Sequence, residues 1–230
     1  MTRGFDPAMY VQALPLYARN LGVLLPPLVA ALISVGLGYF SAWFFAASGG
    51  AGTPFISLIA TIIYGFAFAV SVIFADDAWR HGRASLGAAW NSAQRKAGNI
   101  LVAVIGFLFL TWVARIIGGV GGPTLSLAIG ALAVWAFIYA IPAAAIGGIP
   151  GGASLSASLQ GARRHPLATA VLVIVCIVVW IGINNYAVAY LPFRDGAYDV
   201  AEVILKALAL GYVALVIAKQ YNELAFRAFW

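Results

Sequence analysis

The sequence carries very little charge. Only 9% of its 230 residues are Asp, Glu, Lys or Arg, whereas 63% are hydrophobic. Soluble domains typically contain about 25% charged residues, which cover the surface that faces water. This deficit excludes an ordinary soluble protein and predicts an all-α integral membrane protein with several spans. Because no polar linker is long enough to separate two units, we expect a single membrane domain over residues 1–230.

Residues with reactive or metal-binding side chains are also scarce. The chain has two histidines and one cysteine, Cys176, which excludes an intramolecular disulfide. It has no nucleophile motif and no zinc spacing, and its glycine runs lack the lysine of a phosphate-binding loop. We therefore expect a non-enzymatic protein with no metal and no cofactor. The densest ionisable group, Asp76, Asp77, Arg80 and His81, is either an acid–base cluster or a charged helix end in headgroup water.

Six long apolar stretches dominate what the sequence does contain. A helix that crosses a bilayer needs about 20 mostly apolar residues, and each stretch is close to or above that length. The predicted spans are Gly22–Ala47, Phe55–Ala75, Gly98–Ile117, Thr124–Ile146, Leu167–Tyr190 and Val200–Ala218. Short turns rich in Gly and Pro join them in pairs, which predicts three transmembrane hairpins. No span shows a clear break by Gly or Pro near the middle of the membrane.

A more polar segment precedes each hairpin. Segments 84–97 (ASLGAAWNSAQRKA) and 153–166 (ASLSASLQGARRHP) share Ala, Ser, Leu, Ala, Ala and Arg at equivalent positions, and residues 8–21 form a fainter copy. Apolar residues at i, i+3, i+4 and i+7 predict one face of a helix in each segment. Such helices lie in the plane of the membrane interface. We expect an internal repeat with units of about 8–75, 84–146 and 153–218, followed by an amphipathic tail at 219–230.

The distribution of Lys and Arg predicts the orientation of the chain. Ten of these residues fall on the side of the amphipathic segments, and three, Arg115, Arg194 and Lys206, fall on or near the other side. Since cytoplasmic loops are enriched in Lys and Arg, both termini should be cytoplasmic. The net charge of +6 then favours contact with anionic lipids and gives no reason to expect nucleic acid.

Six basic residues are candidates for binding at the cytoplasmic face. They would contact anionic lipid headgroups or an acidic surface of a partner, either another membrane subunit or a second copy of the chain. Alternatively, they would only fix the topology. Each basic residue near an anionic leaflet contributes about 1 kcal/mol. The six are Arg80, Arg83, Arg95, Lys96, Arg163 and Arg164.

Three further polar residues lie in the outer halves of predicted spans. Asn184 and Asn185 would join helices through buried amide hydrogen bonds, each contributing about 0.6–2 kcal/mol, or they would line a path for a substrate or an ion. Arg115 would extend its aliphatic stem to the interface, or it would pair with an acidic residue of the third hairpin such as Asp199.

The repeated pattern ASLxxAxxxAxR, followed each time by a hairpin, resembles a group of bacterial inner-membrane proteins. The group includes YciC-like proteins and the membrane domain attached to some glycerophosphodiester phosphodiesterases. The resemblance covers most of the chain. It implies a six-helix bundle in a bacterial inner (plasma) membrane, with interfacial helices on its cytoplasmic face. The catalytic domain of the phosphodiesterases has no counterpart here, so the resemblance implies no catalytic residues.

Two functions from different classes follow from these features. The first is an accessory or scaffolding subunit of a membrane complex, or a protein that organises the membrane. The second is a small transporter or lipid-handling protein with a path between the hairpins, which predicts that Asn184, Asn185 or Arg115 faces an internal cavity. An enzyme ranks third, because it would require Asp76, Asp77 and His81 to converge in one pocket.

Overall fold

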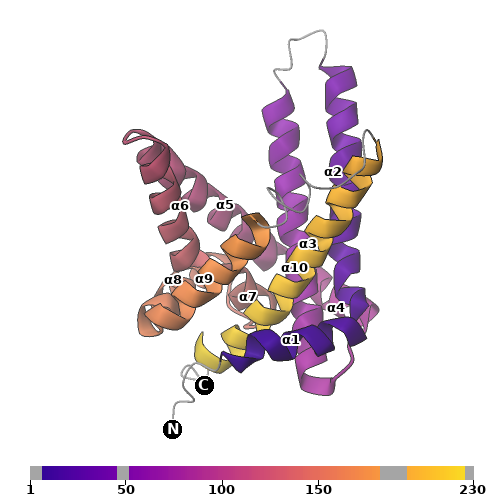
Figure 1. The fold of residues 1–230 in the computed structure, drawn as a ribbon, viewed down its shortest axis with the longest axis vertical. Coiled ribbons are helices and arrows are strands. Elements are labelled where there is room, and N and C mark those ends of the chain that lie inside the picture. The colour runs from indigo at the N-terminus through magenta and orange to yellow at the C-terminus, as the bar shows by residue number, and fades with distance from the viewer. Residues whose placement is uncertain (1–6, 46–51, 182–195, 226–230) are drawn as a thin grey trace.

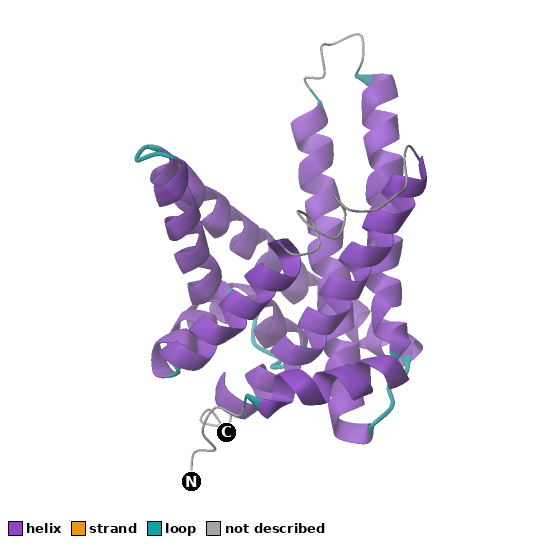
Figure 2. Cartoon of the chain, viewed as in Figure 1, coloured by secondary structure: helices purple, strands orange, loops and turns teal. Residues whose placement is uncertain are grey.

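The computed structural model describes residues 7–45, 52–181 and 196–225. Every regular element in this part of the chain is a helix (Figures 1 and 2). The elements are α1 (Ala8–Arg19), η1 (Leu21–Leu24), α2 (Leu25–Phe44), α3 (Thr53–His81), α4 (Leu86–Arg95), α5 (Ala97–Gly119), α6 (Pro123–Phe137), α7 (Ala140–Ala145), α8 (Gly151–Arg164), α9 (Pro166–Ile181), α10 (Gly196–Gln220) and the π-helical turn η4 (Tyr221–Ala225).

Several of these helices are long and apolar enough to span a membrane, which makes the chain a multi-pass membrane protein. Five candidate spans are Leu21–Phe44, Thr53–His81, Ala97–Gly119, Pro123–Ala145 and Val203–Glu223. A sixth would combine Gly151–Arg164 with Pro166–Val179, but these two helices meet at an angle of 109°. The prediction of six apolar stretches thus corresponds to five or six candidate spans among the described residues, and the end of the predicted fifth span lies outside them.

The end of α3 differs from the predicted one. The second predicted span ends at Ala75, whereas α3 continues through the acidic pair to His81. The extra turn carries its own charge compensation, because Arg80 lies 3.0 Å from Asp76 and His81 lies 2.7 Å from Asp77. Pairs at this i, i+4 spacing stabilise a helix. Gly82 then ends α3 in the left-handed conformation, with φ 77°.

The fourth predicted span is interrupted. Helix α6 ends at Phe137, and α7 begins at Ala140 after a residue, Tyr139, with φ −90° and ψ 0°. Proline at 142 explains the break: it has no N–H to donate to the carbonyl of Ile138, and its ring would collide with that carbonyl in a continuous helix. Helices α6 and α7 nevertheless belong to one candidate span, Pro123–Ala145.

The helices form two groups that meet at one end (Figure 1). Helices α2, α3 and α10 pack together, with α1 crossing α10, and we call them the α3 group. Helices α5, α6 and α9, with α8 beneath them, form the α5 group. The short helix α7 contacts α3, α5 and α8, and all six of its residues are buried. The core therefore sits where the groups meet, and their other ends diverge in Figure 1.

The buried residue Asn20, which directly follows α1, connects the end of α1 to the loop after α3. Asn20 donates to the carbonyls of Leu16 and Gly82, both at 3.0 Å, and accepts from the backbone N–H of Ala84 at 3.1 Å. These bonds use both donors and the acceptor of the amide. They fix α1 across the end of the α3 group.

Candidate functional site

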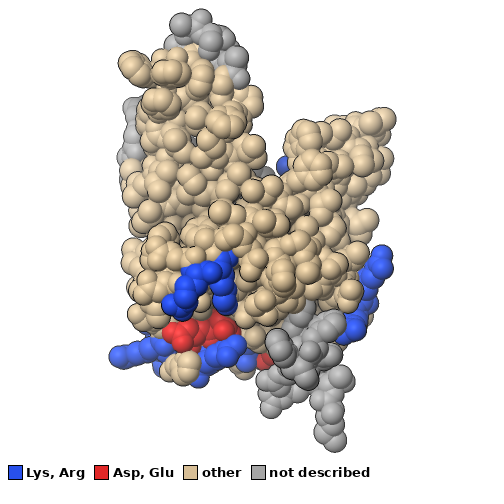
Figure 3. All heavy atoms as spheres, turned by 180° about the vertical axis from the view of Figure 1, so that it is seen from behind, with Lys and Arg blue, Asp and Glu red and all other residues tan. Residues whose placement is uncertain are grey.

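The space between the two helix groups forms an apolar cavity of about 560 Å³, which we call the central cavity. Five helices contribute to its lining: α3, α5, α6, α9 and α10, together with Ile141 of α7. Viewed from behind, the molecule is hollowed between the same groups (Figure 3). Ligand pockets typically enclose about 300–1,000 Å³ and are lined mainly by apolar side chains. The size and lining of the central cavity match that class.

A second cavity of about 530 Å³, the side cavity, lies between α2, α3 and α10. Small residues of α2 leave this space open, since Ser34, Gly38 and Ala42 follow one another at four-residue spacing on one helix face. The sequence pattern alone predicts close helix packing at such a stripe. Here the stripe lines a cavity instead.

Tyr64 of α3 and Lys206 of α10 line both cavities. At about 1.5 Å per residue, Lys206 lies roughly 15 Å along α10 from Gly196 and roughly 21 Å from Gln220. Lys206 is the fourth residue of the candidate span Val203–Glu223. Charged residues within membrane spans are rare and often mark functional sites. The sequence analysis counted Lys206 only toward the orientation. Its place within the predicted span Val200–Ala218 was the available signal.

The end of the central cavity next to α7 rests on a buried hydrogen-bond network. Ile138, Ile141 and Ile217 line the cavity, and their neighbours Tyr139 and Gln220 are almost completely buried. Gln220 donates to the hydroxyl of Tyr139 at 3.0 Å and to the carbonyl of Ala168 at 2.8 Å.

The network continues in both directions from Gln220. The hydroxyl of Tyr10 donates to Oε1 of Gln220 at 3.3 Å, and burial raises the pKa of Tyr10, so this hydroxyl stays protonated. On the other side, Tyr139 lies 3.2 Å from Oγ1 of Thr169, which donates to the carbonyl of His165. The network therefore joins α1 and α10 to the α5 group.

A buried serine satisfies the backbone at the break between α6 and α7. Ser158 of α8 donates to the carbonyl of Ala136 at 2.9 Å and accepts from the backbone N–H of Tyr139 at 3.0 Å. Unpaired backbone groups cost several kcal/mol in a membrane. Ser158 thus makes the break possible and positions the Tyr139 ring for the network.

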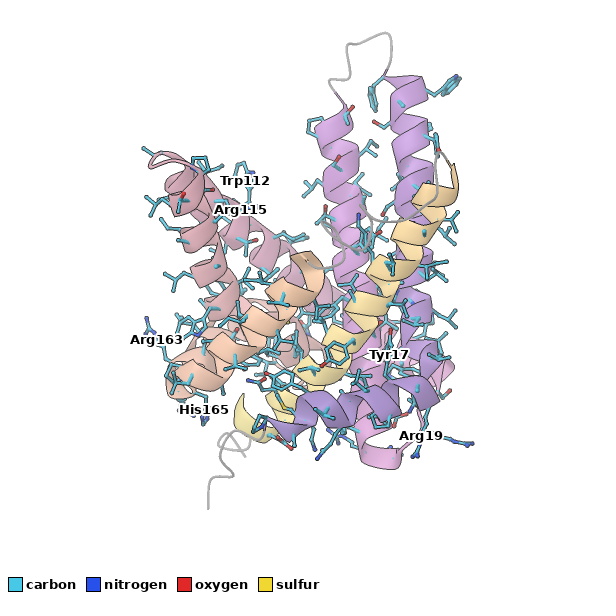
Figure 4. The ribbon with its side chains drawn as sticks, viewed as in Figure 1. Tyr17, Arg19, Trp112, Arg115, Arg163 and His165 are labelled. Carbon is cyan, nitrogen blue, oxygen red and sulfur yellow. The ribbon has the colours of Figure 1, made fainter. Side chains whose placement is uncertain are left out.

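Charged side chains gather at one end of the molecule. The face shown in Figure 3 carries them at its lower end, and Figure 4 places Arg19, Arg163 and His165 at the same end. Within this end, Asp76 accepts hydrogen bonds from Arg80 at 3.1 Å and from Asn222 at 2.6 Å. Lys219 pairs with Glu223 at 2.9 Å and lies over the ring of Trp79.

The six predicted contact residues fall into two environments. Arg80, Arg83, Arg95, Arg163 and Arg164 are exposed at the charged end. Lys96 is half-buried and donates to the carbonyl of Ala145, the last residue of α7, at 2.7 Å. Burial lowers the pKa of Lys96. Lys96 thus has a defined structural contact that the sequence did not indicate.

The predicted intramembrane residues are only partly described. Arg115 lies exposed on α5 near Trp112, at the end of the molecule opposite Arg163 (Figure 4), and its stem packs on Gly130. It lines neither the central nor the side cavity. Asn184 and Asn185 lie outside the described residues, as does the side chain of Asp199, so their predicted roles stay predictions.

The acidic pair that an enzyme would use is engaged within its own helix. Asp76 and Asp77 pair with Arg80 and His81 one turn later on α3. Asn222 also donates a hydrogen bond to Asp76. Among the residues that the structure describes, no group of three His, Cys, Asp or Glu side chains could hold a metal ion.

Comparison with known proteins yields no match to a family model, a curated protein or a solved structure.

Proposed function

We propose that this chain is a non-enzymatic bacterial inner-membrane protein that binds a membrane lipid in the central cavity. The cavity itself carries the proposal, because it lies between two groups of membrane-length helices and has the size of a ligand pocket. Its polar groups in the described lining are few: Thr61, Tyr64, Cys176 and Lys206. Such a lining suits hydrocarbon better than a hydrated solute.

The proposed orientation places the charged end in the cytoplasm. The clustering of Lys and Arg at one end supports it, because cytoplasmic segments are enriched in these residues. The exposed arginines at this end would contact anionic headgroups of the inner leaflet.

The proposed architecture is three hairpins, each preceded by an interfacial helix. The order of elements supports it: α1 precedes α2 and α3, α4 precedes α5 and α6, and α8 precedes α9 and α10. The resemblance to YciC-like and phosphodiesterase-associated membrane domains implies the same order of helices.

Filling the cavity tests lipid binding. Val134 of α6 lines the central cavity, whereas Leu132 of the same helix is 61% exposed and faces away from the core. A tryptophan at 134 would occupy space in the cavity, and a tryptophan at 132 would enter the surrounding membrane. The protein would be extracted in mild detergent with native lipids and weighed by native mass spectrometry.

We expect the unsubstituted chain and Leu132→Trp to retain lipid after delipidation, and Val134→Trp to lose it. Equal retention by the two variants would contradict the proposal, as would an unsubstituted chain without retained lipid. The accessory-subunit hypothesis predicts a different result: a reproducible protein partner in place of lipid, independent of the residue at 134.

A further inference from the structure

We infer that a groove between α2, α3 and α4 binds one phospholipid with an anionic headgroup. The phosphate of this lipid contacts Arg19 and Arg83, and one of its acyl chains lies in the groove. The groove, which we call the α4 groove, has a volume of about 370 Å³. It is a second lipid site, separate from the central cavity, and so goes beyond the proposed function.

Helix α3 separates the α4 groove from the central cavity. Ile63, Phe66 and Ala67 line the groove, whereas Tyr64 and Phe68 line the cavity. At about 3.6 residues per turn, these two sets lie on opposite faces of α3. A lipid bound in one site therefore does not occupy the other.

The lining of the α4 groove suits a hydrocarbon chain. Every residue of its described lining is apolar or glycine. On α2 the lining runs from Leu25 to Ile33, which is about 12 Å along the helix. Trp90 of α4 packs edge-on against Phe66 of α3, with their ring centroids 6.1 Å apart. The groove is therefore elongated and apolar, as an acyl chain requires.

Asn20 brings together two arginines that are far apart in the sequence. It directly follows Arg19, and its side chain bonds to both neighbours of Arg83, namely the carbonyl of Gly82 and the N–H of Ala84. Arg19 and Arg83 therefore project from adjacent stretches of backbone at the charged end.

The same two stretches lead directly into the α4 groove, whose lining includes Leu25, six residues after Arg19, and Leu86, three residues after Arg83. Both arginines are exposed, and Figure 4 shows Arg19 pointing away from the helices. Neither side chain forms an ion pair or hydrogen bond within the described part of the chain.

This combination of charge and apolar surface selects a lipid as the occupant. The guanidinium group of arginine matches the geometry of a phosphate and binds it through two parallel hydrogen bonds. A free phosphate would satisfy the arginines but leave the adjoining groove empty. A phospholipid fills both parts, with its phosphate at Arg19 and Arg83 and a chain beside Trp90.

Photo-crosslinking with two lipids that differ only in the headgroup tests this inference. Nanodiscs would contain equal amounts of phosphatidylglycerol and phosphatidylcholine, with a diazirine halfway along an acyl chain of one lipid at a time. Adducts on Val29, Ile33 and Ile63 would be quantified by mass spectrometry. We expect about tenfold more adduct from phosphatidylglycerol, because each of the two arginines favours an anionic headgroup several-fold.

Removal of both arginine charges should abolish this preference. In Arg19→Gln combined with Arg83→Gln, the yield from phosphatidylglycerol should fall to that from phosphatidylcholine. An unchanged phosphatidylcholine yield shows that the groove is intact. The matched control is Arg163→Gln combined with Arg164→Gln, which removes the same formal charge at the charged end but on α8, and it should keep the preference.

Filling the groove tests the placement of the acyl chain. Gly87 lines the groove, and a Cβ at this position meets only Oγ of Ser85, at 3.9 Å, so a phenylalanine at 87 can enter the groove. Ala88 is exposed and does not line the groove, which makes Ala88→Phe the matched control. We expect Gly87→Phe to lower the adduct yield from both lipids several-fold and Ala88→Phe to leave it unchanged.

Equal yields from the two lipids in the unsubstituted chain would overturn the arginine site. A preference that survives the loss of Arg19 and Arg83, or that disappears equally in the α8 control, would also overturn it and would assign the preference to the charged end as a whole. A groove without adducts, or adducts unchanged by Gly87→Phe, would overturn the placement of the acyl chain. None of these results bears on the central cavity, which Val134→Trp tests separately.

Discussion

Replacement of Gln220 by leucine should destabilise the junction between the two helix groups. Gln220 has no exposed surface and makes three side-chain hydrogen bonds, to Tyr10 at 3.3 Å, Tyr139 at 3.0 Å and the Ala168 carbonyl at 2.8 Å. Leucine has a similar volume but no polar atoms, so the substitution removes all three bonds without opening a large cavity.

The expected loss in unfolding free energy is about 2–3 kcal/mol. A buried hydrogen bond contributes about 0.5–1.5 kcal/mol net in proteins and averages about 0.6 kcal/mol within membrane bundles. Two of the partners keep another bond: Tyr139 still contacts Thr169, and Tyr10 is only half-buried and can turn toward water. The remaining cost comes from the Ala168 carbonyl, which loses the hydrogen bond from Gln220 that joins α9 to α10.

Reversible unfolding in mixed micelles would measure this loss. Gln160→Leu is the matched control, because Gln160 is exposed on α8, and it should change stability by no more than about 0.5 kcal/mol. Tyr10→Phe combined with Gln220→Leu should be less destabilising than the sum of the two, since both remove the same bond. Equal stability of Gln220→Leu and Gln160→Leu would refute the structural role of the network.

Two further predictions concern the α5 group. Gly151→Ala should destabilise the protein by about 1–3 kcal/mol, because its Cβ would collide with the Asn99 carbonyl of α5. A Cβ at position 152 meets no described atom within 4 Å, so Gly152→Ala should stabilise the protein by about 0.5–1 kcal/mol. Similar effects of the two substitutions in thermal unfolding would contradict the close contact between Gly151 and Asn99. Since burial lowers the pKa of Lys96 below its usual 10.5, the unfolded chain binds more protons between the two pKa values, and stability should rise with pH across that window. Lys96→Met should remove this rise in unfolding titrations, and an unchanged pH profile would show that Lys96 is not its source.

Much of the fold is predictable from the sequence because the membrane imposes simple rules. Apolar runs of about 20 residues must form helices, which satisfy every backbone hydrogen bond internally. The prolines at 26 and 27 indicate a helix start, and they lie in the first turn of α2. The acidic pair at 76 and 77 is a misleading signal for the end of the helix. Carboxylates are costly to bury in a membrane, but Arg80 and His81 pair with these two on the same helix.

The cavities and the network are not predictable in the same way. Gln220 contacts Tyr10, 210 positions away in the sequence, and Tyr139, 81 positions away, and no local pattern encodes such pairs. In the sequence, Gln220 resembles an ordinary residue of a polar tail. The break at Tyr139 does have a local signal in the proline at 142, but the serine that makes the break tolerable comes from another helix.

Photo-crosslinking from inside the membrane tests lipid binding most directly. Phosphatidylglycerol with a photoreactive diazirine near the end of an acyl chain would be incorporated into nanodiscs with the protein, and adducts would be mapped by mass spectrometry. We predict adducts on inward residues of three helices, Leu108, Val134 and Val213, and their loss in Val134→Trp. Adducts confined to outward residues such as Leu132, unchanged by Val134→Trp, would contradict a lipid-filled central cavity.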